Sequence, residues 1–148
     1  MDVLTPEQRK RNMRNIKSKD TKIEILLRKA LWKEGFRFRK NFKGLPGKPD
    51  IVLTKYKIAI FCDSEFWHGK DWEQKKIRIQ VNRDYWLTKI EKNIKRDIEI
   101  ENELCNMGWT VLRFWGKDIL KNMNTCIQAI RECILERVIE SNSENLCD

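Results

Sequence analysis

The sequence predicts an α/β fold in which helices flank a mixed central sheet. Its 148 residues suit one domain with its own core, which we place at residues 1–140. Helical and extended patterns follow one another in the order α-α-β-β-β-α-β-α, which favours layers of helices packed on a sheet. In the predicted strand 57–61, residues 58–61 are apolar on both faces, so this strand should lie inside the sheet.

Two helices are predicted before the first strand. Residues 6–17 follow Thr5, a capping residue, and begin with Pro6, which is favoured at the first helical position. This helix is nearly all polar or basic and would bury little, so residues 1–18 are interpreted as a basic arm lying on a charged partner. The second helix begins at Asp20 and Thr21, has apolar residues at helical spacing, and ends at Gly35.

The first three strands are predicted from alternation and turns. Residues 36–39 alternate between aromatic and basic side chains, as in a strand with one solvated face. Residues 43–50 form a loop, because Pro46 and Pro49 resist helix formation. Strands 51–53 and 57–61 are joined by a short turn and should therefore pair antiparallel.

The second half of the chain contributes two helices around one more strand. A long helix is expected over residues 82–107, a strand over 109–115 and an amphipathic helix over 118–138. The predicted inward residues of the long helix are Leu87, Ile90, Ile94, Ile98 and Cys105. Residues 141–148 are rich in serine and asparagine and are expected to form a flexible tail.

The net charge of +9 lies entirely in the first third of the chain. Residues 1–50 hold 15 Lys and Arg against 6 Asp and Glu, whereas the remainder holds 16 of each. A basic segment on a neutral body favours a polyanion partner such as DNA or RNA, although a merely soluble surface is the alternative.

Cysteine usage and hydropathy exclude several classes of protein. The five cysteines are an odd number without a CxxC pair, which disfavours a disulfide framework and a four-cysteine zinc site. No apolar run approaches the roughly 20 residues that span a bilayer, and no signal peptide is recognisable. We expect a cytoplasmic protein that is not bound to a membrane.

Carboxylates at the ends of two neighbouring strands predict a metal site. Asp50 opens one strand and Asp63 follows its antiparallel partner, so the two should lie within a residue or two of register. Mg²⁺ prefers oxygen ligands and often takes only one or two carboxylates together with a phosphate. A metal shared by Asp50 and Asp63 would suit phosphodiester cleavage.

His68 and Asp97 are the candidate acid–base residues. His68 is the only histidine, and imidazole has an unperturbed pKa near neutrality. Asp97, on the long helix, could hold the ring in one tautomer. Glu24 has two readings: it completes a capping box with Thr21, or it points into the site and orients a metal-bound water.

Tryptophan is used heavily, with six in the chain. Phe66 and Trp67 follow the acidic loop, and Trp86 lies near the start of the long helix. Such rings can wedge between base steps of a duplex, whereas packing in the core is the alternative.

Five motifs occur in a fixed order over residues 8–117. They are Lys10-Arg11-Asn12-Met13-Arg14-Asn15-Ile16 continuing to Glu24, Leu45-Pro46-Gly47-Lys48-Pro49-Asp50, and the segments 61–68, 86–97 and 108–115. In this order they resemble the very short patch repair (Vsr) mismatch endonucleases.

The resemblance implies a PD-(D/E)xK restriction-endonuclease-like fold and Mg²⁺-dependent nicking of one strand beside a T:G mismatch. It implies that Asp50 and the chain at Cys62 bind the metal, that His68 is the general base with Asp97 as its partner, and that Glu24 is accessory. The DNA contacts it suggests are a wedge of Phe66, Trp67 and Trp86, with Met13 in the other groove, and the polar residues Arg14, Lys17, Lys48, Lys89 and Asn93.

The sequence departs from the family at two places. Glu65, Lys70, Trp72 and Lys117 stand where many members hold zinc with cysteine and histidine, so we predict no structural zinc. Asp63 stands where a histidine is common, which brings the site closer to an ordinary restriction nuclease and leaves open whether Asp63 or Glu65 is a metal ligand.

Two alternatives to a mismatch nickase therefore remain. One is a restriction-type or other DNA endonuclease, and the other is a catalytically silent DNA-binding module. We expect a monomer, because a nick requires one active site. The sequence identifies neither the DNA recognition site nor a methyltransferase or repair partner.

Overall fold

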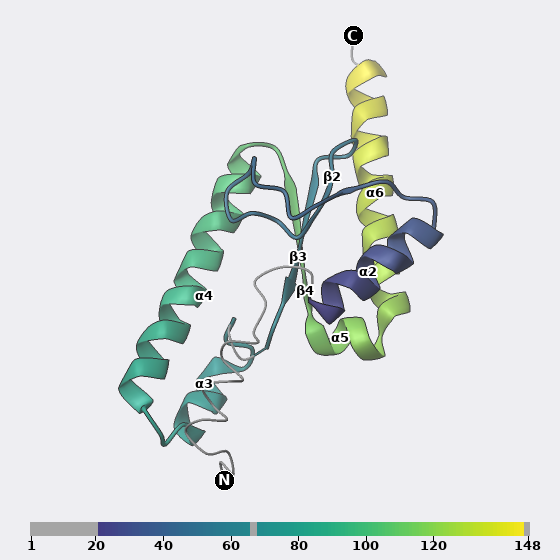
Figure 1. The fold of residues 1–148 in the computed structure, drawn as a ribbon. Helices are drawn as coiled ribbons and strands as arrows, with labels where there is room; N and C mark the ends of the chain where they lie inside the picture. Colours follow the sequence, from purple (N-terminus) through teal and green to yellow (C-terminus); the bar gives the residue numbers. More distant parts are fainter. Residues whose placement is uncertain (1–20, 66–67, 147–148) are drawn as a thin grey trace.

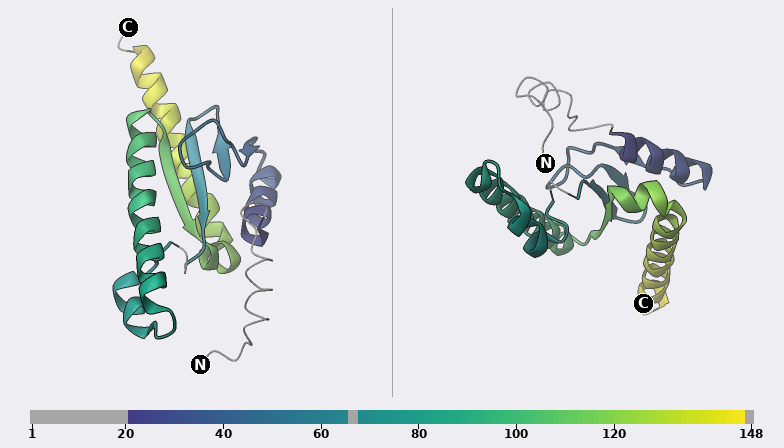
Figure 2. Two further views of the ribbon diagram at one scale, coloured as in Figure 1. Left: turned by 60° about the vertical axis from the view of Figure 1, so that its left-hand side comes forward. Right: turned by 90° about the horizontal axis from the view of Figure 1, so that it is seen from below.

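The computed structural model describes residues 21–65 and 68–146 and has three layers. Helix α4 covers one face of a four-stranded sheet, and helices α2, α5 and α6 cover the other (Figures 1 and 2). In chain order the elements are α2 (Lys22–Lys33), β1 (Arg39–Lys40), β2 (Ile51–Leu53), β3 (Ile58–Asp63), α3 (Trp72–Lys75), the 3₁₀-helix η1 (Lys76–Arg78), α4 (Arg83–Asn106), β4 (Thr110–Trp115), α5 (Gly116–Lys121) and α6 (Met123–Leu146). The predicted α/β fold with helices around a mixed sheet is confirmed.

The sheet has the order β1-β2-β3-β4, and its topology brings the predicted carboxylates together. β1 and β2 pair antiparallel, as do β2 and β3, whereas β3 and β4 are parallel. All six residues of β3 are buried, which confirms its predicted interior position. Since β2 begins at the end of the sheet where β3 and β4 finish, Asp50 and Asp63 lie at that same end.

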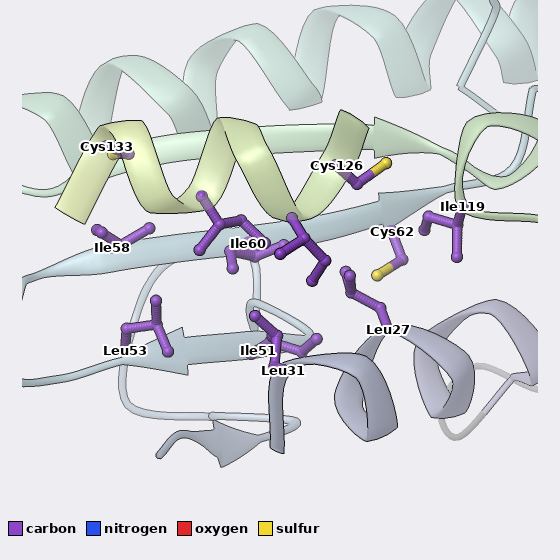
Figure 3. Packing of buried hydrophobic residues seen from close by; sticks show 12 residues of the cluster. Leu27, Leu31, Ile51, Leu53, Ile58, Ile60, Cys62, Ile119, Cys126 and Cys133 are labelled. Atoms are coloured by element: carbon purple, nitrogen blue, oxygen red, sulfur yellow. The ribbon is translucent and has the colours of Figure 1, made fainter. Parts of the chain in front are cut away.

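The side chains of the strands alternate between two apolar clusters. On the α2 side, Ile51 and Ile60 pack with Leu27 and Leu31 of α2 and with residues of α5 and α6 (Figure 3). On the opposite face, Val52, Ala59 and Phe61 pack with Leu104 of α4. Burying both faces is expected for an interior strand, and it fixes the register of the sheet.

Several predicted boundaries were wrong. The predicted helix 118–138 is two helices, separated at Asn122, and the second continues through Leu146 because no glycine or proline interrupts residues 118–146. Helix therefore occupies residues 141–146, where a flexible tail was predicted. The predicted strand 36–39 is shorter and begins only at Arg39. Residues 72–78, which the sequence pattern left unassigned, form α3 and η1.

The inward face of α4 also differs from the prediction. Ile98 is 56% exposed and Cys105 is exposed, whereas Ile90 and Leu104 are buried. A residue eight positions further along a helix is turned about 80° around the helix axis. A residue seven positions further along is turned only about 20°, in the opposite direction. From Ile90, the sheet-facing line therefore runs through Asp97 to Leu104 instead of through Ile98.

The predicted basic arm, residues 1–18, lies outside the described residues. Within residues 21–65 and 68–146, no helix is both long enough and apolar enough to cross a bilayer.

Candidate active site

A polar cleft of about 400 Å³ opens where β2 begins and β3 ends. It is lined from both layers of helices, by α2 on one side and α4 on the other, and by β4 and the loop before β2. All five residues predicted to be catalytic line this cleft: Glu24, Asp50, Asp63, His68 and Asp97. The structure thus brings together residues that span 74 positions of the chain (24 to 97).

Asp50 is held against β3 by a backbone hydrogen bond. The Cys62 N–H donates to Asp50 Oδ2 at 2.8 Å. Burial raises the pKa of Asp50 to about 7, the Cys62 N–H opposes this, and the carboxylates of Glu24 and Asp63 raise it further. Carboxylates crowded in this way fit a divalent cation, whose charge would relieve their repulsion and whose preferred ligands are oxygen atoms.

Cys62 faces the site through its backbone only. Its side chain packs in the apolar cluster beside Leu27 (Figure 3), where burial raises the pKa of the thiol. A protonated thiol on the core side of the sheet is unsuited to bind Mg²⁺. The predicted contribution of the chain at Cys62 is therefore restricted to the main chain.

The structure disfavours the capping role of Glu24 and places its side chain at the cleft, whereas its action on a metal-bound water stays a prediction. Thr21 is the N-cap of α2, but its side chain makes no cap hydrogen bond, so the capping box is not formed. The Glu24 side chain is instead buried and lines the cleft, with its Oε2 3.9 Å from Arg28 Nη1. Glu24 thus faces Asp50.

His68 is paired with Asp97 across the cleft. His68 Nδ1 lies 2.6 Å from Asp97 Oδ2, and His68 Nε2 lies 3.8 Å from Asp63 Oδ1. Burial lowers the pKa of His68, but the hydrogen bond to Asp97 and the charges of Asp63 and Asp97 outweigh it, so the pKa is raised overall. The contact with Asp97 fixes the orientation of the imidazole ring. The catalytic roles of His68 and Asp97 stay a prediction.

Gly69 is needed directly after the histidine. Its φ is +70°, and a Cβ atom there would lie 2.4 Å from Ile94 Cδ1 of α4. Any side chain would therefore push the loop away from the helix that carries Asp97.

Arg113 is a residue of the site that sequence reasoning missed. It lies on β4 next to Phe61 on β3, and its Nη1 donates to Asp63 at 3.0 Å (Oδ2) and 3.3 Å (Oδ1). Burial raises the pKa of Asp63, although His68 and Arg113 oppose the shift. The available signal was a single charge in a strand that is otherwise largely apolar.

Asp63 forms a close group with His68 and Asp97, and its charge also acts on Asp50. The ligand atoms of Asp63, His68 and Asp97 all lie within 4.8 Å of one another. That Asp50 and Asp63 share a metal ion stays a prediction.

The predicted DNA-binding residues divide into two sets. Lys48 and Asn93 line the cleft, Lys89 is exposed on α4, and Trp86 is half-buried with its ring centroid 5.0 Å from that of Tyr85. Met13, Arg14, Lys17, Phe66 and Trp67 lie outside the described residues. Of the three predicted wedge residues, only Trp86 lies among the described residues, and it is neither buried in the core nor part of the cleft lining.

The four positions predicted not to bind zinc have other contacts. Glu65 Oε1 accepts a hydrogen bond from the backbone N–H of Lys117 at 2.6 Å. Trp72 is buried, and its Nε1 donates to Glu91 Oε1 at 3.3 Å. Lys70 Nζ lies 5.7 Å from the centre of the Trp115 ring. These contacts connect the histidine loop to α4, β4 and α5.

Asp50 should make the metal-free protein less stable as the pH rises. Its pKa is about 7 in the fold against an ordinary value of 3.8, so between these values the native state keeps a proton that the unfolded chain releases. Asp50→Asn should remove this loss, and the variant should gain stability over wild type from pH 4 to pH 7, reaching about 2 kcal/mol after allowance for solvent exposure. Urea unfolding with a chelator at pH 4, 5.5 and 8 measures it. A difference that does not vary with pH would contradict it.

The fold and the cleft together define a nuclease of the restriction-endonuclease-like class. The profile of the family described as "DNA mismatch endonuclease Vsr" matches residues 1–74. The chain is 52% identical over 137 residues to the type II nicking enzyme V.NmeDIP of Neisseria meningitidis serogroup C, covering 93% of each chain. It is 50% identical over 140 residues to the type II nicking enzyme V.HpaIIP of Haemophilus parainfluenzae, covering 94% of this chain and 99% of that one.

A third relative carries the family's own name. The DNA mismatch endonuclease Vsr of Escherichia coli K12 is 38% identical over 114 residues, which cover 77% of this chain and 72% of the relative. The protein belongs to the Vsr family and is a DNA endonuclease.

Proposed function

We propose that the protein nicks one strand of duplex DNA beside a T:G mismatch and that it requires Mg²⁺. The observation that carries the proposal is the Asp50 carboxylate, fixed by the Cys62 N–H, in the same cleft as the His68–Asp97 pair. Relatives named nicking enzymes and one named a mismatch endonuclease support single-strand cleavage and the mismatch substrate.

Asp50 and the main-chain carbonyl of Cys62 would hold the Mg²⁺ ion, with Glu24 orienting a water. When bound, such an ion neutralises charge on the phosphate and lowers the pKa of its water. The raised pKa of Asp50 supports this set, because a carboxylate that is unfavourable when charged and alone gains most from a cation.

His68 would accept the proton of the attacking water. Its Nδ1 lies 2.6 Å from Asp97 Oδ2, so the ring donates its Nδ1–H to the carboxylate and presents Nε2 as an acceptor. The net rise in the pKa of His68 makes it a stronger base than free imidazole. Asp97 acts through His68 as a positioning residue.

Cleavage of end-labelled duplexes tests this function directly. Matched duplexes and duplexes with one T:G pair, in varied sequence contexts, are incubated with Mg²⁺ and with a chelator. A nick in one strand beside the mismatch, absent with the chelator, is expected. Cutting of matched duplexes would favour the restriction-type alternative, and mismatch binding without any cutting would favour the silent DNA-binding module.

The edge strand of the sheet offers a basic surface for the phosphates of the bound duplex. Residues 36–48 contain five basic and no acidic side chains, and all five are exposed: Arg37, Arg39, Lys40, Lys43 and Lys48. Lys48 also lines the cleft. The Arg37 Cζ atom lies 3.7 Å from the centre of the Trp32 ring, so changing Arg37 would also disturb this packing. The charges of Arg39, Lys40 and Lys43 are therefore better suited to a test.

Changing Arg39, Lys40 and Lys43 together to glutamine should flatten the salt dependence of DNA binding. The slope of log affinity against log salt should fall by about 0.9 for each phosphate that is no longer neutralised, with little effect on the rate at saturating DNA. Fluorescence anisotropy between 50 and 200 mM salt measures the slope. The matched control changes Lys92, Lys95 and Lys121, which are exposed on α4 and α5. Equal slopes in both triple variants would mean that net charge, and not this edge, determines affinity.

A further inference from the structure

Arg113 is a cation fixed between two acidic side chains of the cleft. Its Nη1 lies 3.0 Å from Asp63 Oδ2 and 3.8 Å from Asp97 Oδ1, and its Nη2 donates to the Asp97 backbone carbonyl at 3.4 Å. Its carbon Cζ lies 4.2 Å from the centre of the Phe61 ring, and its side chain is 19% exposed. Strand, ring and two carboxylates thus determine where the guanidinium lies.

We propose that the Arg113 guanidinium is the resident cation of the Asp63–His68–Asp97 group, which it holds in place and from which it excludes a divalent metal ion. The proposal rests on the proposed function, since it assigns the metal ion to Asp50 and excludes Asp63 as a ligand. It goes beyond that function by giving Asp63 and Arg113 a role together.

The group would otherwise be suited to a metal ion. Its ligand atoms, two carboxylate oxygens and an imidazole nitrogen, lie within 4.8 Å of one another. The same kinds of atom bind divalent cations in many proteins. Here Arg113 already makes two hydrogen bonds to Asp63, and a second cation at the group would meet the guanidinium charge within a few ångströms.

An arginine suits this role better than a lysine. The planar fork of the guanidinium can contact Asp63 and the Asp97 backbone at the same time, which a single ammonium group does less well. Asp97 in turn contacts His68 Nδ1, so the arginine is linked to the imidazole through the two aspartates. We therefore expect Arg113 to position His68 without contacting DNA.

The exclusion of a metal ion from this group is tested by adding Mn²⁺ alone to the full chain. Calorimetry and electron paramagnetic resonance measure how many ions bind. Asp50→Asn should bind no ion, and Asp50→Asn with Arg113→Met should bind one. Adding Asp63→Asn to that double variant should abolish binding again. The proposal is overturned if the double variant binds no ion, or if Asp50→Asn alone binds an ion that Asp63→Asn removes. Because ion binding is read without cleavage, failure of the proposed function would be seen separately.

Kinetics of Arg113→Lys test the positioning role in a variant that keeps the charge. The turnover number should fall at least 10-fold while KM for DNA stays within about 3-fold, because the planar fork is removed while the groups that bind DNA are unchanged. The lysine variant should also still exclude the second ion, which keeps the proposal testable if Arg113→Met does not fold. A raised KM with unchanged turnover would show that Arg113 binds DNA and would overturn the positioning role.

Discussion

Replacing Asp50 by asparagine is expected to lower the cleavage rate at least about 1,000-fold, which is several kcal/mol of lost charge stabilisation. DNA affinity should stay equal or improve, because a negative charge next to the scissile phosphate is removed. The expectation depends on position: the Asp50 carboxyl is held by the Cys62 N–H in a cleft that also holds Glu24 and Asp63. Asparagine keeps the shape of the side chain but offers the metal ion no charge.

Single-turnover cleavage at saturating protein, together with binding of the same labelled duplex, separates the two effects. Glu99→Gln is a matched control, since Glu99 is an exposed acid on α4 outside the cleft. It should cleave as wild type does. An Asp50→Asn protein that retains more than a tenth of the wild-type rate would show that the metal site is elsewhere.

The hairpin that carries Asp50 could be predicted because its information is local. Two short apolar strands separated by a turn specify an antiparallel pair, and the register follows from the turn. The sequence alone therefore places Asp50 and Asp63 at the same end of the sheet. The pairing of His68 with Asp97 followed from the residues only as one possibility, since 29 residues separate them, and the resemblance implied it directly.

The role of Arg113 could not be predicted from periodicity. It contacts Asp63 because β3 and β4 are parallel neighbours in a register that pairs Phe61 with Arg113, 52 positions along the chain. Hydrophobic alternation identifies a strand, but it does not give the neighbour or the register of a crossover connection. The same limit explains Ile98, which fits a run of apolar residues four apart but is rotated away from the sheet.

His68→Ala should lower the single-turnover rate by about 100- to 10,000-fold, the range typical of a lost general base. Asp97→Asn should lower it less, because the imidazole remains but the Nδ1 contact at 2.6 Å no longer favours the tautomer that leaves Nε2 free. Adding Asp97→Asn to His68→Ala should have almost no further effect, since Asp97 acts only through the ring.

Two controls separate this expectation from loss of the fold. Thermal unfolding shows whether each variant is native, and Glu99→Gln is a matched change on α4, because Glu99 is exposed and lies outside the cleft. If the effects of His68→Ala and Asp97→Asn multiply in the double variant, Asp97 has a function independent of the histidine. Its backbone carbonyl and carboxylate also contact Arg113, so that outcome would transfer its main role from the general base to the arginine. If the double variant is instead no slower than His68→Ala alone, Asp97 acts through the protonation state of His68.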